Sequence, residues 1–286
     1  MPTLAANEAS QTKICFKGVS KVFTIRPGSG TGQREQPSNF VALNDVSFDV
    51  RAGELVTLVG PSGCGKSTLL DLLCGLTAPT SGRILVDGRP VDGPGLDRGI
   101  VFQQYALFPW RTALGNVEFG LEAKGGIPKA ERTRRARAFL SMVGLSDFED
   151  RYPHELSGGM KQRVAIARSL SYDPDILLMD EPFAALDEET RESLQRELLG
   201  IWQRTGKTIV FITHSIDEAV FLGQRVVVMA ARPGRIKAIV DIPIDGRTGD
   251  DDIRSRPDFV RLRHQIWTLV RASASSPPLP ETLAAA

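Results

Sequence analysis

A short glycine-rich segment constrains the fold of this chain more than any other feature. Residues 60–67 read Gly-Pro-Ser-Gly-Cys-Gly-Lys-Ser and follow directly on Leu-Val-Thr-Leu-Val at 55–59. Such a short apolar run is typical of a strand buried on both faces, and the spacing of residues 66–76 predicts a helix immediately afterwards. A buried strand that turns sharply into a helix opens a parallel α/β unit, so the sequence predicts an α/β fold.

The same segment predicts a phosphate-binding loop. Its glycines allow successive backbone N–H groups to turn inward, and the helix that begins near Lys66 directs its positive end at the same anion. Lys66 offers a charge to the β- and γ-phosphates, and Ser67 offers a hydroxyl to Mg²⁺. The alternative is a chance match in a glycine-rich turn, which the flanking strand and helix disfavour. The nucleotide contacts expected here come from Gly60, Pro61, Ser62, Gly63, Cys64, Gly65, Lys66, Ser67 and Thr68.

The number and spacing of the cysteines indicate a reducing compartment, and the position of one of them predicts a reactive thiol. The three cysteines, Cys15, Cys64 and Cys74, lack the spacing of zinc ligands. Cys15 and Cys74 are interpreted as small buried apolar residues. Cys64 lies at a predicted helix N-terminus, which lowers a thiol pKa. We therefore expect alkylation of Cys64 to inactivate the protein and ATP to protect it.

Two acids follow a second apolar run. Residues 176–179 predict another buried strand, and Asp180 and Glu181 come directly after it. The carboxyl ends of buried parallel strands border the ligand crevice of an open α/β sheet. Asp180 is therefore placed to hold Mg²⁺ and Glu181 to orient an attacking water. The alternative is that two acids simply end a strand in solvent.

The remaining patterns agree with a mainly parallel sheet covered by helices. No run of 18 apolar residues and no secretory signal pattern occurs, so neither a transmembrane helix nor export is expected. Lys and Arg total 35 and Asp and Glu 34, and this balance argues against a nucleic-acid partner. Strands are predicted at 14–24, 41–50, 83–87, 208–213 and 225–229, helices at 129–143, 158–170, 188–204 and 258–270, loops at 26–39 and 245–256, and disorder at 273–286.

A third segment completes a recognisable set of motifs. Residues 156–163, Leu-Ser-Gly-Gly-Met-Lys-Gln-Arg, place a Ser-Gly-Gly turn at the start of a basic helix, a second candidate anion-binding end. Together with the loop at 60–67 and the acids at 180–181, it resembles the signature motif of the ATP-binding-cassette (ABC) ATPases. The resemblance implies a P-loop NTPase fold with a RecA-like core, an antiparallel β subdomain and an inserted α-helical subdomain at about 105–165. The implied domains are a flexible N-terminus (1–12), the ABC ATPase domain (13–245) and a partly disordered C-terminal extension (246–286).

The resemblance also implies roles for individual residues. Phe23 resembles the aromatic that stacks on adenine, with a core strand residue as the alternative. Gln103 resembles the glutamine that senses Mg²⁺ and links to the membrane subunits, with a solvated loop amide as the alternative. His214 resembles the switch histidine at the γ-phosphate. The implied catalytic set is Glu181, His214, Lys66 and Gln103, the Mg²⁺ ligands are Ser67, Gln103 and Asp180, and further nucleotide contacts come from Ser157, Gly158, Gly159, Gln162 and Asp187.

Partners follow from the same resemblance. The signature of one subunit completes the site of the other, which implies a two-fold homodimer with two ATP at its interface. Two membrane permease subunits are implied as partners, with a periplasmic or extracellular substrate-binding protein indirectly. The chain is then expected at the cytoplasmic face of the inner membrane as a peripheral protein, with ATP and Mg²⁺ as cofactors.

Two narrower strings indicate the class of transporter. Leu-Phe-Pro-Trp-Arg-Thr at 107–112 and Val-Met-Ala-Ala-Arg-Pro-Gly-Arg-Ile at 228–236 resemble the nitrate, sulfonate and taurine importer ATPases. Residues 105–113 also predict an exposed apolar patch for a partner helix, the alternative being that Phe108 and Trp110 pack inside the helical subdomain. The expected function is ATP hydrolysis that energises uptake of a small anion such as nitrate, sulfonate or taurine. The alternatives are another class of ABC importer or a non-transport ABC ATPase.

Overall fold

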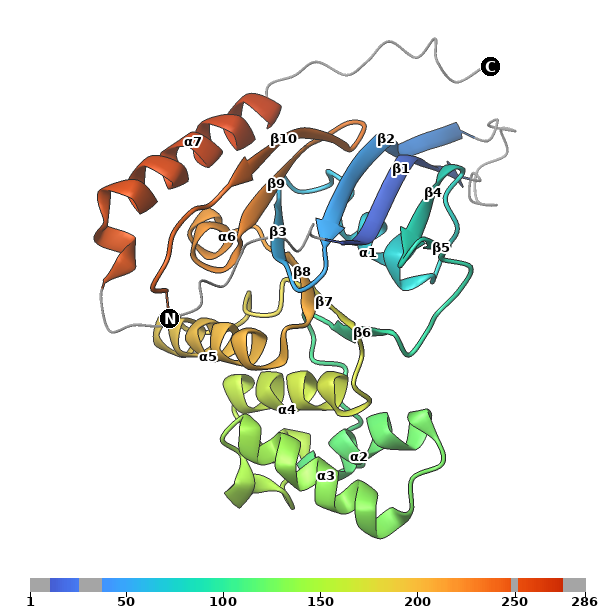
Figure 1. Cartoon of the computed structure of the whole chain (residues 1–286), viewed down its shortest axis with the longest axis vertical. Coiled ribbons are helices and arrows are strands. Elements are labelled where there is room, and N and C mark those ends of the chain that lie inside the picture. Colours follow the sequence, from blue (N-terminus) through green and yellow to red (C-terminus); the bar gives the residue numbers. More distant parts are fainter. Residues whose placement is uncertain (1–10, 26–37, 248–251, 275–286) are drawn as a thin grey trace, which may run out of the picture.

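Two β-sheets form the frame of the molecule (Figure 1). The computed structural model describes residues 11–25, 38–247 and 252–274. Within them, the smaller sheet is antiparallel and packs one face on the core, where the rings of Phe16 and Phe48 stack at 4.5 Å. Its strands lie in the order β2 (Ser38–Arg51), β1 (Thr12–Ile25), β4 (Ser81–Val86) and β5 (Arg89–Pro90). This is the predicted antiparallel β subdomain.

The larger sheet contains the predicted parallel core. Five of its strands run parallel and β10 pairs antiparallel with β9. Parallel strands need crossover connections, and α5 (Glu188–Thr205) supplies the one from β7 to β8 and α6 (Ile216–Leu222) the one from β8 to β9. The strand order is β10 (Arg235–Asp241), β9 (Arg225–Ala230), β3 (Leu55–Val59), β8 (Thr208–Ile212), β7 (Ile176–Asp180) and β6 (Arg98–Val101).

Strand β3 explains why the sheet requires covering on both faces. Every residue of β3 is buried. Leu55 and Val59 belong to one hydrophobic core, which the helices α5 and α6 cover. Val56 and Leu58 belong to a second core, shared with α1 (Lys66–Cys74) and the smaller sheet. Burial of alternate side chains in two separate cores accounts for the continuous apolar run in the sequence.

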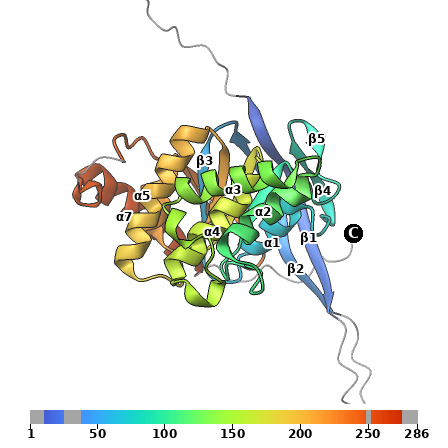
Figure 2. The same cartoon turned by 90° about the horizontal axis from the view of Figure 1, so that it is seen from below.

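A helical subdomain lies below the sheets and is inserted between β6 and β7 (Figures 1 and 2). It contains α2 (Ala113–Lys124), α3 (Lys129–Met142) and α4 (Gly158–Ser171), with short 3₁₀ helices at Ser146–Phe148 and Pro153–Glu155. A Cβ added at Gly120 of α2 would lie 2.2 Å from Ser171 Oγ, so α2 and α4 meet at this glycine. Gly115 and Gly120 lower the helix propensity of α2, which is why the sequence pattern did not reveal it.

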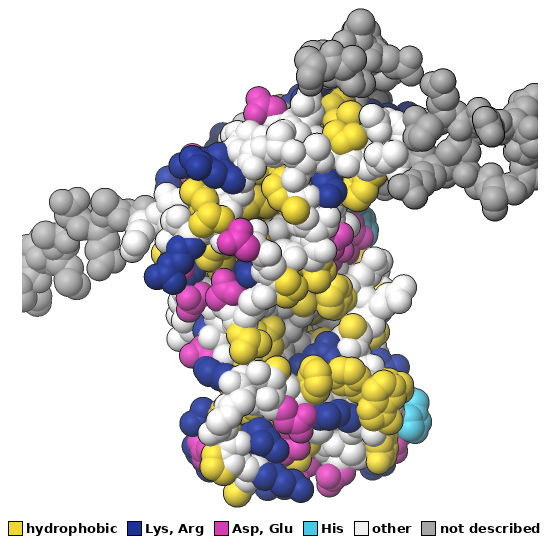
Figure 3. Space-filling model, turned by 90° about the vertical axis from the view of Figure 1, so that its right-hand side faces the viewer, with side chains coloured by type: hydrophobic (Ala, Val, Ile, Leu, Met, Phe, Trp, Pro, Cys, Tyr) yellow, Lys and Arg dark blue, Asp and Glu magenta, His cyan; other side chains and the backbone are white. Residues whose placement is uncertain are grey.

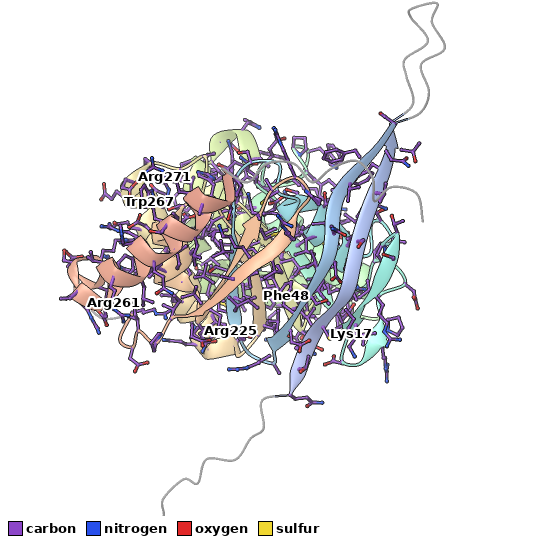
Figure 4. All side chains as sticks on the ribbon, turned by 90° about the horizontal axis from the view of Figure 1, so that it is seen from above. Lys17, Phe48, Arg225, Arg261, Trp267 and Arg271 are labelled. Carbon is purple, nitrogen blue, oxygen red and sulfur yellow. The ribbon has the colours of Figure 1, made fainter. Side chains whose placement is uncertain are left out.

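The C-terminal extension contains a packed helix. Helix α7 (Pro257–Ala274), preceded by a 3₁₀ helix at Ile253–Ser255, packs on α6, β9 and β10. Phe259, Leu262 and Ile266 are buried on one side of α7, whereas Trp267 is exposed and is seen with Arg261 and Arg271 in Figure 4.

Arg225 of β9 donates to Glu54 and to the Asp49 carbonyl of β2, which ties the two sheets together.

The observed helices and strands differ from the predicted ones in several places. Helix α7 continues through residues 273–274, where disorder is predicted, and residues 275–286 lie outside the described part of the chain. The predicted loop at 26–39 also lies mostly outside it, and residues 38–39 belong to β2. Strands β6 and β10 and helix α6 were not predicted, because four to seven residues are too short for a periodic signal and, unlike β3, these segments are not continuous apolar runs. None of the described helices is both long and apolar enough to cross a membrane.

Candidate active site

The glycine-rich segment forms a tight turn between β3 and α1. Gly63 and Gly65 adopt φ values of +75° and +89°, which glycine reaches without strain. A Cβ on Gly65 would lie 2.6 Å from Leu43 Cδ2 and 3.0 Å from Ala42 O, so the loop passes close against β2. Helix α1 begins at Lys66 with no side chain capping it. The N–H groups of its first turn are therefore available to an anion.

Lys66 is held inside this loop. Its side chain is buried, and its Nζ donates to Gly60 O at 3.0 Å and to Pro61 O at 3.5 Å. A pocket of about 310 Å³ lies over the loop and is lined by residues 62–68 together with Phe40, Ala42 and Glu181. An ammonium group and a helix N-terminus at one pocket can bind a polyphosphate.

The expected alkylation of Cys64 requires an accessible thiol, and the structure buries this side chain. Cys64 is 0% exposed, and a Cβ added at Gly60 would approach its Sγ to 2.7 Å. Burial raises the pKa of the Cys64 thiol, although the charge of Lys66 acts in the opposite direction. Desolvation is the larger effect, so the pKa of the Cys64 thiol lies above its ordinary value despite the opposing charge of Lys66. A nucleotide contact from Cys64 would therefore use its backbone.

The two acids and the histidine meet at one edge of the larger sheet. Asp180 ends β7, Glu181 follows it, and His214 lies two residues beyond the end of the neighbouring strand β8. His214 Nδ1 lies 3.1 Å from Glu181 Oε2. Glu181 has a φ of +45°, a strained conformation for a non-glycine residue that is typical of functional sites. The fold thus brings together residues predicted from two separate motifs.

Ser67 and Asp180 could hold a divalent cation. Burial raises the pKa of the Asp180 carboxyl, and a hydrogen bond from Ser67 opposes this shift. The two side chains are therefore adjacent, and hydroxyl and carboxylate oxygens are ligands that Mg²⁺ prefers. Gln103 follows β6, which pairs with β7 at Val101 and Met179, so it lies at the same end of the sheet. This donor set fits Mg²⁺.

A buried network anchors the turn that carries His214. Thr213 Oγ1 donates to the Glu218 carboxylate, which also accepts from Gln195 Nε2 at 3.0 Å. Arg254 of the C-terminal extension donates to Gln195 Oε1 at 2.6 Å. Helices α5 and α6 and the extension thus converge behind the histidine. Sequence reasoning missed these residues, because Gln195 and Arg254 are far apart in the chain and match no local motif.

The signature segment opens helix α4. Ser157 is exposed and caps the helix, its hydroxyl accepting from Met160 N at 3.3 Å. A Cβ added at Gly158 would lie 3.1 Å from Leu186 Cδ2, so the signature turn lies against the loop after Glu181. Two segments predicted to serve the dimer interface are therefore neighbours on the surface of one subunit.

Gln162 and Asp187 differ in their availability to a nucleotide. Gln162 is 0% exposed, and its amide atoms have no hydrogen-bond partner among the described residues. A side chain fully buried in its own subunit is not available to a nucleotide, so the predicted contact of Gln162 is contradicted. Asp187 is exposed and caps α5, its carboxylate accepting from Thr190 N at 2.9 Å.

Phe23 lies on the surface of β1. It is 41% exposed, and the Nζ of Lys21 lies 5.1 Å from the centre of its ring. This exposure contradicts the alternative that Phe23 is a core strand residue. Its contact with adenine remains a prediction.

Comparison with known proteins decides the family. The ABC transporter family model matches residues 43–184. A taurine import ATP-binding protein of Roseobacter denitrificans is 49% identical over 80% of this chain and 86% of that protein. A nitrate import ATP-binding protein of Synechocystis sp. is 51% identical over 81% of this chain and 88% of that protein. The chain belongs to the ABC transporter family.

A solved structure agrees with this assignment. It is a dimeric ATP-binding cassette in a post-hydrolysis state, bound to ADP and phosphate. It is 35% identical to this ABC protein, has a TM-score of 0.68, and is matched over 80% of this chain and 98% of its own. The fold expected from the resemblance is thereby confirmed, and the chain is an ABC-type ATPase.

This ABC ATPase carries an apolar patch on its helical subdomain. The docking patch, defined as Phe108, Trp110 and Phe119, has ring centres 5.4 Å apart for Phe108 and Trp110 and 4.6 Å apart for Phe108 and Phe119. Trp110 is 71% exposed, so the alternative that it packs inside the subdomain is wrong. The face in Figure 3 shows hydrophobic side chains over the lower, helical part of the molecule, among Lys and Arg.

The loop that presents the docking patch is held from two helices. Asn116 of α2 is fully buried; its Oδ1 accepts from Phe108 N at 2.8 Å and its Nδ2 donates to Phe108 O at 3.2 Å. Arg168 of α4 donates to Ala106 O at 2.6 Å and to Tyr105 O at 3.0 Å. These anchors were also missed, because an Asn and an Arg within helices carry no distinctive local signal.

Proposed function

We propose that this protein is the ATP-hydrolysing subunit of an ABC importer for a small anion such as nitrate, a sulfonate or taurine. The observation that carries the proposal is the convergence of the loop at 60–67, the acids at 180–181 and His214 at one end of the parallel sheet. The relatives named as taurine and nitrate import ATP-binding proteins support the choice of cargo.

Within one subunit, the side chains divide the work of hydrolysis. Lys66 and the N–H groups of the loop hold the β- and γ-phosphates of ATP. Ser67, Asp180 and Gln103 would hold Mg²⁺, which supplies positive charge to the phosphate oxygens when bound. Glu181 orients the attacking water for in-line displacement, and His214, placed by its contact with Glu181, steadies the γ-phosphate.

The second half of each site comes from another copy of the chain. Ser157, Gly158 and Gly159 form an anion-binding helix end that lies on the helical subdomain, and exposed Asp187 lies beside it. In a two-fold dimer these groups of one protomer meet the γ-phosphate bound by its partner. The dimeric state of the similar cassette that binds ADP and phosphate supports this arrangement.

Two permease subunits are the membrane partners of the dimer. The docking patch is apolar, its Trp110 is 71% exposed, and Asn116 and Arg168 hold the loop that carries it, as docking of a short permease helix requires. The dimer is then peripheral at the cytoplasmic face of the membrane. A substrate-binding protein on the other side delivers the anion to the permease and does not contact this chain.

A pair of variants tests the hydrolytic site. Glu181→Gln should reduce ATP turnover at least a hundredfold while ATP binding persists and traps a stable dimer, because the water loses its orienting carboxylate. Lys66→Ala should instead weaken ATP binding itself. Phosphate release, equilibrium dialysis and size-exclusion chromatography measure the three quantities. Retained turnover in Glu181→Gln would exclude Glu181 as the catalytic acid.

The cargo is tested with the assembled transporter. The full chain is co-purified with its permease and reconstituted in vesicles with the binding protein. Nitrate, taurine and an alkanesulfonate are then compared as stimulants of ATP turnover and as transported ions. Stimulation by one of these anions supports the proposal. Turnover and transport that respond only to an unrelated solute would assign the chain to another class of ABC importer.

A further inference from the structure

A second aromatic side chain lies beside Phe23 at the mouth of the phosphate loop. Strands β1 and β2 pair antiparallel with Phe23 directly opposite Phe40. Directly opposed residues of an antiparallel pair project from the same face of the sheet. Both side chains are exposed, Phe23 to 41% and Phe40 to 49%. Two partly exposed rings on one face of a strand pair form a small apolar surface that a ligand can cover.

Phe40 is continuous with the phosphate pocket. The register of β2 against β1 shifts at Ala42, and both Phe40 and Ala42 line the pocket formed with residues 62–68. Ala42 also touches the loop closely, since a Cβ added at Gly65 would lie 3.0 Å from Ala42 O. The row from the loop through Ala42 to Phe40 therefore leads outward from the phosphates, in the direction that the rest of a bound nucleotide must take.

The two rings differ in what already covers them. The ammonium of Lys21 lies over the ring of Phe23 and is fixed by hydrogen bonds to Thr77 Oγ1 and Ala78 O, each at 2.7 Å. Within the described ranges of the chain, no cation or ring is stacked on Phe40. Phe40 thus offers the pocket an uncovered aromatic surface.

We propose that Phe40 is a base-binding residue, whose ring packs on the nucleobase of the nucleotide held by the loop at 60–67. The inference rests on the proposed nucleotide site and adds to it an aromatic that no motif indicates. Stacking requires only the flat face of a base, so Phe40 contributes affinity without selecting adenine over guanine. Its contribution is separable from that of Lys66, whose proposed role is to bind the phosphates.

The test compares a nucleotide with its phosphate part alone. ADP and inorganic diphosphate are titrated calorimetrically, in the presence of Mg²⁺, into the full chain and into Phe40→Ala. The variant should bind ADP about tenfold more weakly, while its affinity for diphosphate stays within twofold of the wild-type value. Phe148→Ala removes a ring of similar exposure (37%) from the helical subdomain and should change neither affinity.

Further outcomes separate this inference from the site on which it rests. ADP binding by Phe40→Ala within twofold of wild type would overturn it. If Phe40→Ala loses both ligands, the variant Phe40→Trp decides between the explanations. Quenching of the added tryptophan fluorescence by ADP but not by diphosphate supports the stacking. An absence of quenching by ADP overturns the inference. A wild-type chain that binds neither ligand would refute the nucleotide site itself.

Discussion

Replacing Arg247 with Met should destabilise the whole cassette, although Arg247 lies at the start of the C-terminal extension. Its guanidinium is buried and donates to Ile244 O at 2.9 Å, Ile242 O at 2.8 Å, Leu222 O at 2.9 Å and Gly223 O at 2.7 Å. Two of these carbonyls lie at the C-terminus of α6, where a cation also interacts favourably with the helix dipole. Arg247 therefore ties the extension to the helix that follows His214.

Two opposing effects determine how much folding free energy Arg247→Met loses. The four short bonds are charge-assisted, and Arg247→Met leaves the four buried carbonyls without this donor, which costs ~1.5 kcal/mol each, or about 6 kcal/mol together. Against this, burial lowers the pKa of Arg247 to about 10. That shift corresponds to a desolvation cost of about 3 kcal/mol, which the neutral methionine recovers. The hydrogen bonds exceed the recovered desolvation, so Arg247→Met should lose about 3 kcal/mol of folding free energy.

Thermal unfolding of the nucleotide-free chain measures this loss. For a protein of this size, about 3 kcal/mol corresponds to a fall in Tm of roughly 6–10 °C. Arg263→Met is the matched control, because Arg263 is an exposed residue whose ion pair with Asp217, at 3.3 Å, should contribute little. A Tm for Arg247→Met within 2 °C of the control would show that the bonds and the desolvation cancel, and would refute this reasoning.

Two further predictions concern the cysteines and the docking patch. Iodoacetamide at pH 8 should leave Cys64 and Cys74 of the native chain unmodified, because both side chains are buried. Burial raises the pKa of the Cys64 thiol, and it raises the pKa of the Cys74 thiol to about 12. Rapid labelling of Cys64 that ATP prevents, detected by mass spectrometry, would contradict this prediction. Trp110→Ala should keep the ATP turnover of the isolated chain but weaken permease co-purification at least tenfold, as expected for an exposed aromatic anchor. Trp267→Ala on α7, also exposed, is its control and should co-purify normally.

The local features of the site could be predicted because neighbouring residues encode them. An apolar strand followed by glycines and Lys66 specifies a turn into a helix end, whichever segments surround it. In the same way, an apolar strand that ends in Asp180 and Glu181 places two acids at the carboxyl end of a sheet. The short strand β6 and the glycine-containing helix α2 escaped prediction because their own residues carry weak signals, and their neighbours stabilise them.

What the sequence determined by itself was therefore the chemistry that each short segment can offer. Only the tertiary structure decided which of those groups are accessible and which meet. Cys64 and Gln162 belong to the predicted motifs, yet their side chains are buried, whereas Phe40 belongs to no motif and its ring is exposed at the pocket. His214 reaches Glu181 because β7 and β8 pair in one register. Burial and contact depend on how distant segments pack together, and a pattern of neighbouring residues does not record that packing.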